Sequence, residues 1–249
     1  MKDVLDPGDE IDMNSLIGKQ VRITFENTIH CVVTGKKIKK TFGEGMSYPA
    51  WISSPSSVES IIRPELSRIH EGIALRDAEW EEEHHNKPHF VYISRTAGIK
   101  VGVTRSINVP YRWIDQGAVE AILLVETPYR QLAGLIEVSL KEHMSDKTNW
   151  RAMLKNEMLN DIDLVDAKEE VLELLDESYY DFISEDDEVT EIEYPVIEYP
   201  LKVSSMKLDK LPVIDLKLMG IKGQYLIFEG GKVINIRSHA GYRVTIEAG

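Results

Sequence analysis

The stretch from His89 to Glu137 constrains the fold of this chain most, because regular elements follow one another there at short spacing. Residues 90–95 and 99–104 are two short runs with the pattern of β-strands, and Gly98 lies in the turn between them. We therefore expect a β-hairpin at the start of this stretch.

The hairpin is followed by a segment of helical character and then by a further strand. The helical segment contains Pro110, Arg112 and Trp113, and residues 119–126 form a third apolar β-run. A second helix then carries Glu137. The sequence thus predicts the order β-β-α-β-α. Alternatively, this stretch is a β-hairpin plus a helix that carries no chemistry.

Composition indicates a soluble, packed protein. The chain has 249 residues, of which 43% are hydrophobic, enough for one large domain or two to three small ones. No apolar run approaches the ~20 residues that span a bilayer, and the acidic N-terminus has no apolar signal region. The single cysteine, Cys31, excludes an intramolecular disulfide. We expect a cytoplasmic protein with no membrane partner.

The net charge of −13 is unevenly distributed. Residues 160–199 hold sixteen acidic residues and one lysine, so the rest of the chain has a net charge of +2. Residues 19–40 contain six basic residues against one glutamate, and residues 95–112 contain four basic residues and no acid. Local basic surfaces of this kind permit DNA or RNA as a partner. Alternatively, the lysines of residues 36–40 are ordinary solvated side chains.

The central stretch resembles the GIY-YIG nuclease superfamily. The similarity lies in Val91-Tyr92-Ile93, a short turn, the sequence KVGVT, an arginine eight residues later and a glutamate on the last helix. It is closest to a divergent branch whose second tripeptide is KIG. The resemblance covers about a fifth of the chain. The whole chain also resembles a bacterial family known only as a domain of unknown function.

The resemblance implies a metal-dependent nucleic-acid phosphodiesterase. Glu137 would bind one Mg²⁺ or Mn²⁺ ion, because a single carboxylate suits a cation that keeps its water ligands. Tyr92 would bind the attacking water or act as a base, and Lys100 takes the place of the second tyrosine. Gly102 would allow close backbone approach to the phosphate. The residues implied to bind and stabilise the phosphate are Arg105 and Arg112.

Departures from the superfamily pattern leave other functions open. The first tripeptide lacks its glycine, the second lacks its tyrosine, and Gln116 and its neighbour replace an aromatic or histidine. Glu137 and Lys141 could be a plain i,i+4 ion pair worth roughly 0.2–0.5 kcal/mol. Tyr92 could be a strand aromatic, and Arg112 could pair with Asp115. The alternatives are a catalytically inactive nucleic-acid-binding module and a protein-interaction scaffold.

The N-terminal region has the spacing of a zinc ribbon without its ligands. Residues 21–25 and 29–33 predict two strands, and Cys31-x2-Thr34 is followed by Ser47-x2-Ala50. A zinc ribbon needs four converging ligands, and relatives in the suspected family carry cysteine at these places. One thiolate cannot hold a structural zinc, so we expect a degenerate ribbon that binds no zinc. Alternatively, the region never held a metal.

A charged helix is predicted over residues 77–85, after a short helix over residues 60–75. Four histidines nearby could suggest a metal site, namely His70, His84, His85 and His89. His84 and His85 are adjacent and cannot share one helix face. We expect these histidines to lie on the surface.

The C-terminal region predicts a small β barrel. Strands are expected over residues 196–203, 213–218, 223–228, 232–237 and 242–247, with turns at Gly220 and Gly230-Gly231. The fold class is therefore α+β. The expected parts are a flexible N-terminus (1–14), a ribbon-like β module with a helical connector (15–87), a GIY-YIG-like core (88–160), an acidic helical connector (161–194) and the barrel (195–249).

Overall fold

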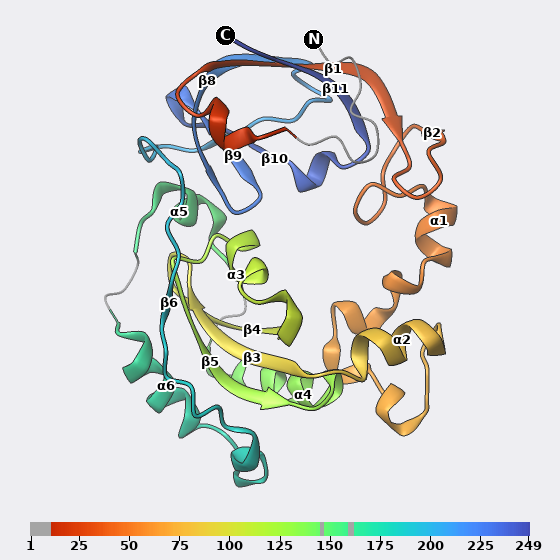
Figure 1. The fold of residues 1–249 in the computed structure, drawn as a ribbon, viewed down its shortest axis with the longest axis vertical. Helices are drawn as coiled ribbons and strands as arrows, with labels where there is room; N and C mark the ends of the chain where they lie inside the picture. Colours follow the sequence, from red (N-terminus) through yellow and green to blue (C-terminus); the bar gives the residue numbers. More distant parts are fainter. Residues whose placement is uncertain (1–10, 145–146, 159–161) are drawn as a thin grey trace. The chain divides into compact units, whose positions relative to one another are not determined.

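The computed structural model describes residues 11–144, 147–158 and 162–249 (Figure 1). The chain forms two compact units. Unit 1 combines residues 1–53 with residues 194–249, and unit 2 spans residues 54–193. Unit 1 therefore joins the N-terminal segment to the C-terminal strands. The first ten residues of the expected flexible N-terminus lie outside the described residues. So do residues 145–146 and 159–160 of the expected core and residue 161 of the expected acidic connector.

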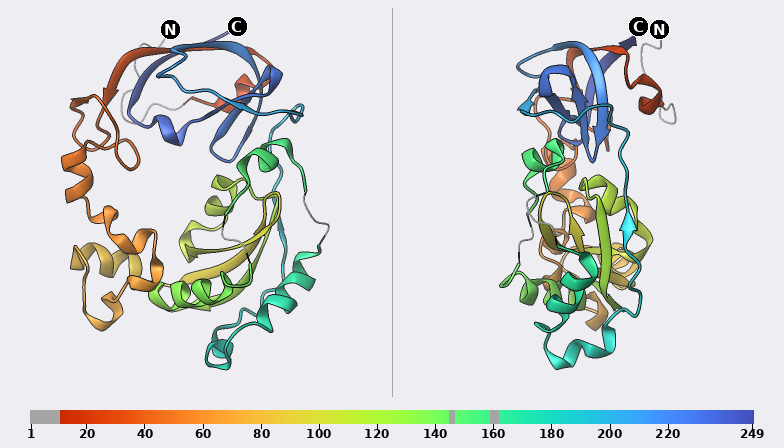
Figure 2. Two further views of the ribbon diagram at one scale, coloured as in Figure 1. Left: turned by 180° about the vertical axis from the view of Figure 1, so that it is seen from behind. Right: turned by 90° about the vertical axis from the view of Figure 1, so that its left-hand side faces the viewer.

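Unit 1 is built on one sheet with the order β11-β1-β8-β9-β10-β7, in which β2 also pairs with β1. The described strands pair antiparallel, except that β10 and β7 are parallel. Figure 2 shows the red N-terminal strand β1 between blue C-terminal strands. The strands of this unit are β1 (Gln20–His30), β2 (Lys37–Ile38), β7 (Ser204–Ser205), β8 (Val213–Lys222), β9 (Tyr225–Phe228), β10 (Lys232–Asn235) and β11 (Tyr242–Ala248). Their apolar faces share one core, which includes Val21, Ile214 and Phe228.

The prediction of a closed C-terminal barrel is wrong. The described strands of unit 1 form an open sheet that ends at β11 and β7. The C-terminal strands also do not form a sheet by themselves, because β1 lies between β8 and β11, with Ile23 opposite both Ile214 and Ile246. The predicted strand over residues 196–203 is reduced to an isolated bridge between Val196 and Gly220. Gly220 is therefore not a turn but a close contact inside β8.

The two predicted N-terminal strands are a single strand. β1 runs unbroken from Gln20 to His30, and its pairing with β11 is interrupted only between Phe25 and Ile29. Asn27 has a φ of 51° at this point, which bends the strand without ending it. The predicted turn at Gly230 and Gly231 is confirmed, since both residues have positive φ.

Unit 2 is built on a second antiparallel sheet with the order β4-β3-β5-β6. The strands are β3 (His89–Arg95), β4 (Ile99–Arg105), β5 (Glu120–Thr127) and β6 (Thr190–Glu191). The predicted order β-β-α-β-α is present here, because α3 (Tyr111–Asp115) lies between β4 and β5, and α4 (Arg130–Leu140) follows β5. Figure 1 shows α3 and α4 on opposite sides of this sheet.

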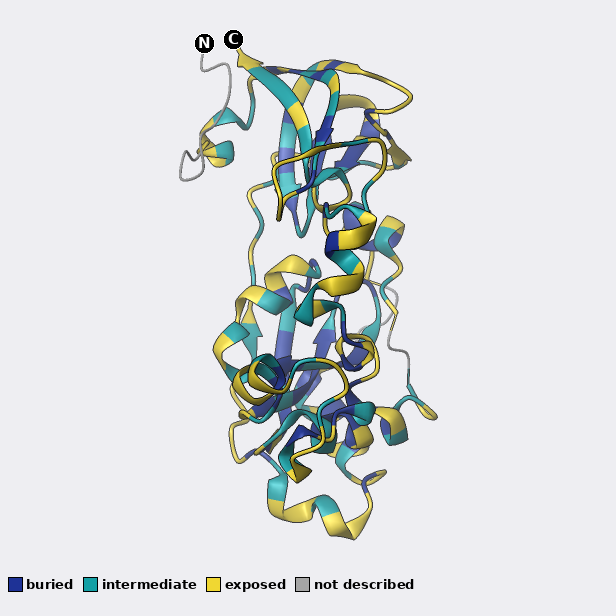
Figure 3. Cartoon of the chain, turned by 90° about the vertical axis from the view of Figure 1, so that its right-hand side faces the viewer, coloured by how far each residue is buried: buried dark blue, intermediate teal, exposed yellow. Residues whose placement is uncertain are grey.

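The two sides of this sheet have different cores. Val91, Ile93 and Val101 pack with α4 and α6 (Leu164–Leu172) on one side. Tyr92 packs with Trp113 of α3 on the other side. This separation follows from the alternation of side chains along a strand. In Figure 3 the buried residues gather along the strands, whereas many residues of the short helices are exposed.

The acidic segment after the core is part of unit 2 and packs on its sheet. Leu164, Ala167 and Val171 of α6 belong to the same apolar core as β3 and β5. Lys168 is buried, and its ammonium group donates to the carbonyls of Ser184 and Asp186 at 2.9 and 2.8 Å. Lys168 therefore joins α6 to the acidic residues around Asp186.

The remaining elements are short. The other α-helices are α1 (Tyr48–Ser53), α2 (Ala78–His85) and α5 (Trp150–Lys155). The predicted helix over residues 60–75 is replaced by single 3-10 turns. The 3-10 segments are Met13–Leu16, Pro55–Ser57, Glu59–Ile61, Pro64–Leu66, Ile69–Glu71, Ser106–Asn108, Glu177–Phe182, Glu229–Gly231 and Arg237–His239. Within the described ranges, no helix has the length and apolar character needed to cross a bilayer.

Candidate active site

Tyr92 is the central residue of the candidate site. It lies on β3, is 0% exposed, and meets the ring of Trp113 edge to face at a centroid distance of 5.7 Å. Across the hairpin it is paired with Gly102 of the edge strand β4. A Cβ at Gly102 would lie 2.8 Å from the Tyr92 hydroxyl oxygen and 2.9 Å from Cζ. Gly102 is therefore required because the tyrosine ring crosses over it.

The hydroxyl of Tyr92 is buried without a hydrogen bond to any part of the described chain. Burial raises the pKa of Tyr92, and the carboxylate of Glu137 raises it further. Arg112 and Gln116 lower the pKa of Tyr92, although neither reaches hydrogen-bond geometry with the hydroxyl. Tyr92 is therefore protonated near neutral pH, and the charges of Arg112 on α3 and Glu137 on α4 both act on its hydroxyl.

Lys100 contacts the protein rather than open solvent. It lies on β4, is 5% exposed, and its ammonium group donates to the side-chain oxygen of Gln116 after the end of α3. Gln116 thus connects Lys100 with the surroundings of Tyr92. A phosphate could reach Lys100 only after this contact opened.

Glu137 lies at the border of the apolar face of α4. Ala133, Ile136 and Leu140 form the buried face of this helix, and Glu137 is 7% exposed. Its Oε2 atom lies 3.2 Å from Nζ of Lys141. The i,i+4 ion pair that the sequence offered as an alternative is therefore present. The same carboxylate also raises the pKa of Tyr92 and of Arg130.

Arg130 was not predicted as a site residue. Its guanidinium donates to the carbonyls of Ser60 and Ile61 at 2.8 and 2.9 Å, and Nη1 lies 3.4 Å from Nε2 of His89. Burial lowers the pKa of Arg130 to about 10, and Glu137 opposes this shift.

Two further arginines, Arg105 and Arg112, also lower the pKa of Arg130. The charges of Arg105 and Arg112 thus both repel the guanidinium of Arg130. Arg105, Arg112, Arg130 and Glu137 form an electrostatic cluster that is rich in positive charge. Such a cluster favours binding of a polyanion, because an added phosphate would relieve the repulsion.

The expectation of surface histidines is wrong for two of the four. His85 and His89 are 2% and 0% exposed. Burial is the main cause that lowers the pKa of His85 to about 3 and that of His89 to about 4, so both are neutral at pH 7. The hydroxyls of Ser60 and Ser67 lie 3.4 and 3.3 Å from Nδ1 of His85.

The other two histidines stack on aromatic rings. His70 lies 3.9 Å from the ring of Tyr129, and His84 lies 4.1 Å from the ring of Trp80. Across the described ranges, no three His, Cys, Asp or Glu side chains are grouped to hold a metal.

The ribbon-like segment belongs to unit 1. The thiol of Cys31 is buried, and its Sγ accepts a hydrogen bond from the backbone N–H of Ser47 at 3.1 Å. Hydrogen bonds from Thr34 and Ser47 lower the pKa of Cys31 to about 6, against an opposing effect of burial. Ala50 donates its backbone N–H to the Ser47 hydroxyl. The four positions of the expected degenerate ribbon are therefore neighbours.

Sequence reasoning missed Gln116 and Arg130 as site residues for a physical reason. Gln116 was noted only as a replacement on the first helix, and Arg130 lies at the start of α4 without a motif around it. Both are placed by tertiary contacts, with β4 in one case and with the 3-10 segment near Ser60 in the other. The only available signal was their position beside the predicted residues Arg112 and Glu137.

The fold and the site thus define an α+β protein with two sheets and a buried tyrosine on which an arginine and a glutamate act. The chain belongs to the family described as "Protein of unknown function (DUF2797)", which it matches over residues 18–244. Comparison with curated proteins and with solved structures gave no match.

Proposed function

We propose that this protein is a nucleic-acid phosphodiesterase with a GIY-YIG-like core that depends on Mg²⁺ or Mn²⁺. The observation that supports this most is the convergence of Tyr92, Arg112 and Glu137. These residues come from β3, α3 and α4, and the charges of Arg112 and Glu137 both act on the Tyr92 hydroxyl. The same three residues are those that the resemblance implies.

Cleavage of a phosphodiester needs an activated water, a stabilised phosphate and a neutralised leaving oxygen. A divalent ion on Glu137 would supply Lewis acidity and a bound water. A single carboxylate suits Mg²⁺, which keeps most of its hydration shell. Lys141 would have to release Glu137 for this role, and the pair is worth only roughly 0.2–0.5 kcal/mol at an i,i+4 spacing.

The chain's own residues would then position the water and the phosphate. Because burial raises the pKa of Tyr92, its role is to orient the water through its hydroxyl rather than to remove a proton. Arg112, Arg105 and Arg130 would neutralise the phosphate oxygens. Guanidinium groups suit this task, since they stay charged and bind two oxygens at once.

A second candidate is a nucleic-acid-binding module without turnover. The ion pair between Glu137 and Lys141, and the contact between Lys100 and Gln116, both favour this alternative. In such a module the arginine cluster would bind phosphates, and Glu137 would only stabilise α4. A protein-interaction scaffold remains the third hypothesis from the sequence.

The test is a cleavage assay on labelled single- and double-stranded DNA and RNA, with Mg²⁺, Mn²⁺ or EDTA. Wild type and Glu137→Ala are assayed in parallel, and binding is measured by gel shift on the same samples. Cleavage that needs the metal and is lost in Glu137→Ala supports the phosphodiesterase. Salt-dependent binding without cleavage supports the binding module. The absence of both activities would overturn the two nucleic-acid proposals.

A further inference from the structure

Three aromatic rings of unit 1 gather beside the ribbon-like turn. Phe42 lies 5.1 Å from Tyr48 and 6.2 Å from Trp51, and Tyr48 lies 6.1 Å from Trp51, all between ring centroids. Tyr48 and Trp51 are on α1, and Phe42 is on the turn before it. Gly43 lets Trp51 pack closely, because a Cβ there would lie 2.9 Å from its ring. We call Phe42, Tyr48 and Trp51 the aromatic cluster.

The aromatic cluster is partly open to solvent. Tyr48 is 52% exposed, whereas Phe42 and Trp51 are half-buried and support it. A tyrosine with half its surface in water is not a core residue, and it lies in a helix of only six residues. About half of this side chain is therefore accessible to an external partner.

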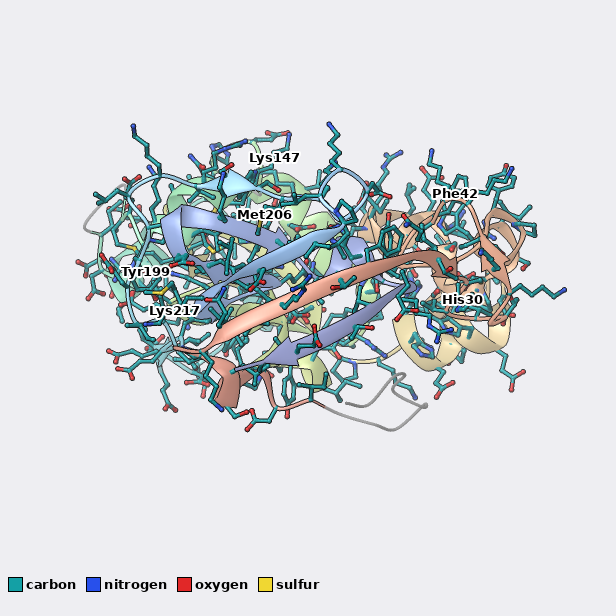
Figure 4. The ribbon with its side chains drawn as sticks, turned by 90° about the horizontal axis from the view of Figure 1, so that it is seen from above. His30, Phe42, Lys147, Tyr199, Met206 and Lys217 are labelled. Carbon is teal, nitrogen blue, oxygen red and sulfur yellow. The ribbon has the colours of Figure 1, made fainter. Side chains whose placement is uncertain are left out.

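Four exposed lysines lie directly before the aromatic cluster in the chain, at residues 36, 37, 39 and 40. Within the described ranges none of them forms an ion pair with an acidic side chain. The ammonium group of Lys40 lies 5.3 Å from the centre of the Phe42 ring, so this lysine touches the cluster. The one acid of residues 30–53, Glu44, is paired with Arg237. Phe42 and His30 are labelled in Figure 4, which shows this part of unit 1.

Unit 1 as a whole is positively charged, in contrast to the chain. It contains fifteen lysines and arginines against twelve acidic residues, although the full chain has a net charge of −13. The strong negative charge lies in unit 2. An anionic partner would therefore be attracted to the lysines of unit 1.

We propose that the aromatic cluster and the four lysines form a binding surface for single-stranded nucleic acid. Lysines would contact the phosphates, and an unpaired base would stack on Tyr48, since every base has a π-face for such contact. A duplex keeps its bases stacked inside and cannot use the ring. This surface shares no residue with the candidate active site, so its test does not depend on the proposed cleavage.

The test measures binding of a labelled oligothymidylate to the full chain by fluorescence anisotropy in EDTA, where no metal-dependent cleavage can occur. The first variant is Tyr48→Ala. The second replaces the four lysines by glutamine. Its matched control replaces four other exposed lysines of unit 1 by glutamine, namely Lys207, Lys210, Lys217 and Lys232. All changed side chains are exposed, and circular dichroism checks that each variant is folded.

We expect Tyr48→Ala to weaken binding about 5- to 150-fold, the range for loss of one base–aromatic stack. The lysine variant should lower the slope of log K against log salt by about 3, because each single-strand phosphate contact contributes about 0.7. The control should change the affinity and the salt slope less than the lysine variant does. Absence of wild-type binding, equal weakening in the control, or equal affinity for the matching duplex would overturn the proposal. So would tighter binding to vesicles of anionic lipid than to the oligonucleotide.

Discussion

Replacing Tyr92 with phenylalanine should stabilise the protein and remove the proposed cleavage activity. The hydroxyl is fully buried and has no hydrogen-bond partner within the described chain, and such a group costs about 1–3 kcal/mol. Phenylalanine keeps the contacts with Trp113 and Gly102. We therefore expect the free energy of unfolding to rise by about 1 kcal/mol, which corresponds to about 2–4 °C in Tm.

The assay pairs urea and thermal unfolding with the cleavage measurement. Tyr242→Phe is the control, because the Tyr242 hydroxyl donates to the carboxylate of Asp209 at 3.0–3.1 Å. The free energy of unfolding of this control should fall by about 1 kcal/mol, whereas that of Tyr92→Phe should rise. If Tyr92→Phe is destabilised by more than the control, its hydroxyl has a hydrogen-bond partner in solution. If Tyr92→Phe cleaves like wild type, the hydroxyl has no catalytic role.

Three further predictions concern Gly102, Cys31 and Lys222. Gly102→Ala should lower the free energy of unfolding by about 1–3 kcal/mol in urea, and adding Tyr92→Phe should recover part of it, because the closest atom is then removed. The alkylation rate of Cys31 should rise through pH 6, and Thr34→Val should move this pH upward, since Thr34 lowers the pKa of the thiol. Because the unfolded thiol has a pKa of about 8.5, this depression should make stability rise between pH 6 and 8.5. Burial lowers the pKa of Lys222 to about 8, so wild-type stability should also rise from pH 8 towards about 10.4, and Lys222→Met should remove this rise.

The core elements of unit 2 could be predicted because their signals are local. The alternation over residues 90–95 and 99–104 places Val91 and Ile93 on one side of the sheet and Tyr92 on the other. Asp77 likewise caps the predicted charged helix, where its side chain accepts from the N–H of Trp80 at 2.9 Å. Patterns of a few residues are enough to place such elements.

The sheet of unit 1 could not be predicted in the same way, because its main pairing joins the two ends of the chain. Strand β1 pairs with β8 and β11 about 200 residues away, and nothing in the sequence near Gln20 points to a partner at that distance. The C-terminal strands by themselves show the spacing of a barrel. In the structure β1 instead lies between β8 and β11, and the described sheet stays open at β11 and β7.

The candidate site was predicted only in part for a related reason. Tyr92, Arg112 and Glu137 were named from a motif, whereas Arg130 depends on two backbone carbonyls about 70 residues earlier. The buried histidines show the same limit. His85 lies in a run of glutamates that indicates a surface helix, yet it is buried, with the hydroxyls of Ser60 and Ser67 beside its ring.

The most direct test of the proposed function compares Glu137→Gln with two controls in a single-turnover cleavage assay at saturating Mg²⁺. Lys141→Met removes the partner of the ion pair, and Glu142→Gln removes an exposed acid close by. We expect Glu137→Gln to lower the cleavage rate by about 10²–10³-fold, the effect of removing one group that stabilises the transition state. The two controls should remain within a few-fold of wild type. Equal losses in Glu137→Gln and Lys141→Met would show that the glutamate only stabilises α4, and would contradict the proposed phosphodiesterase site.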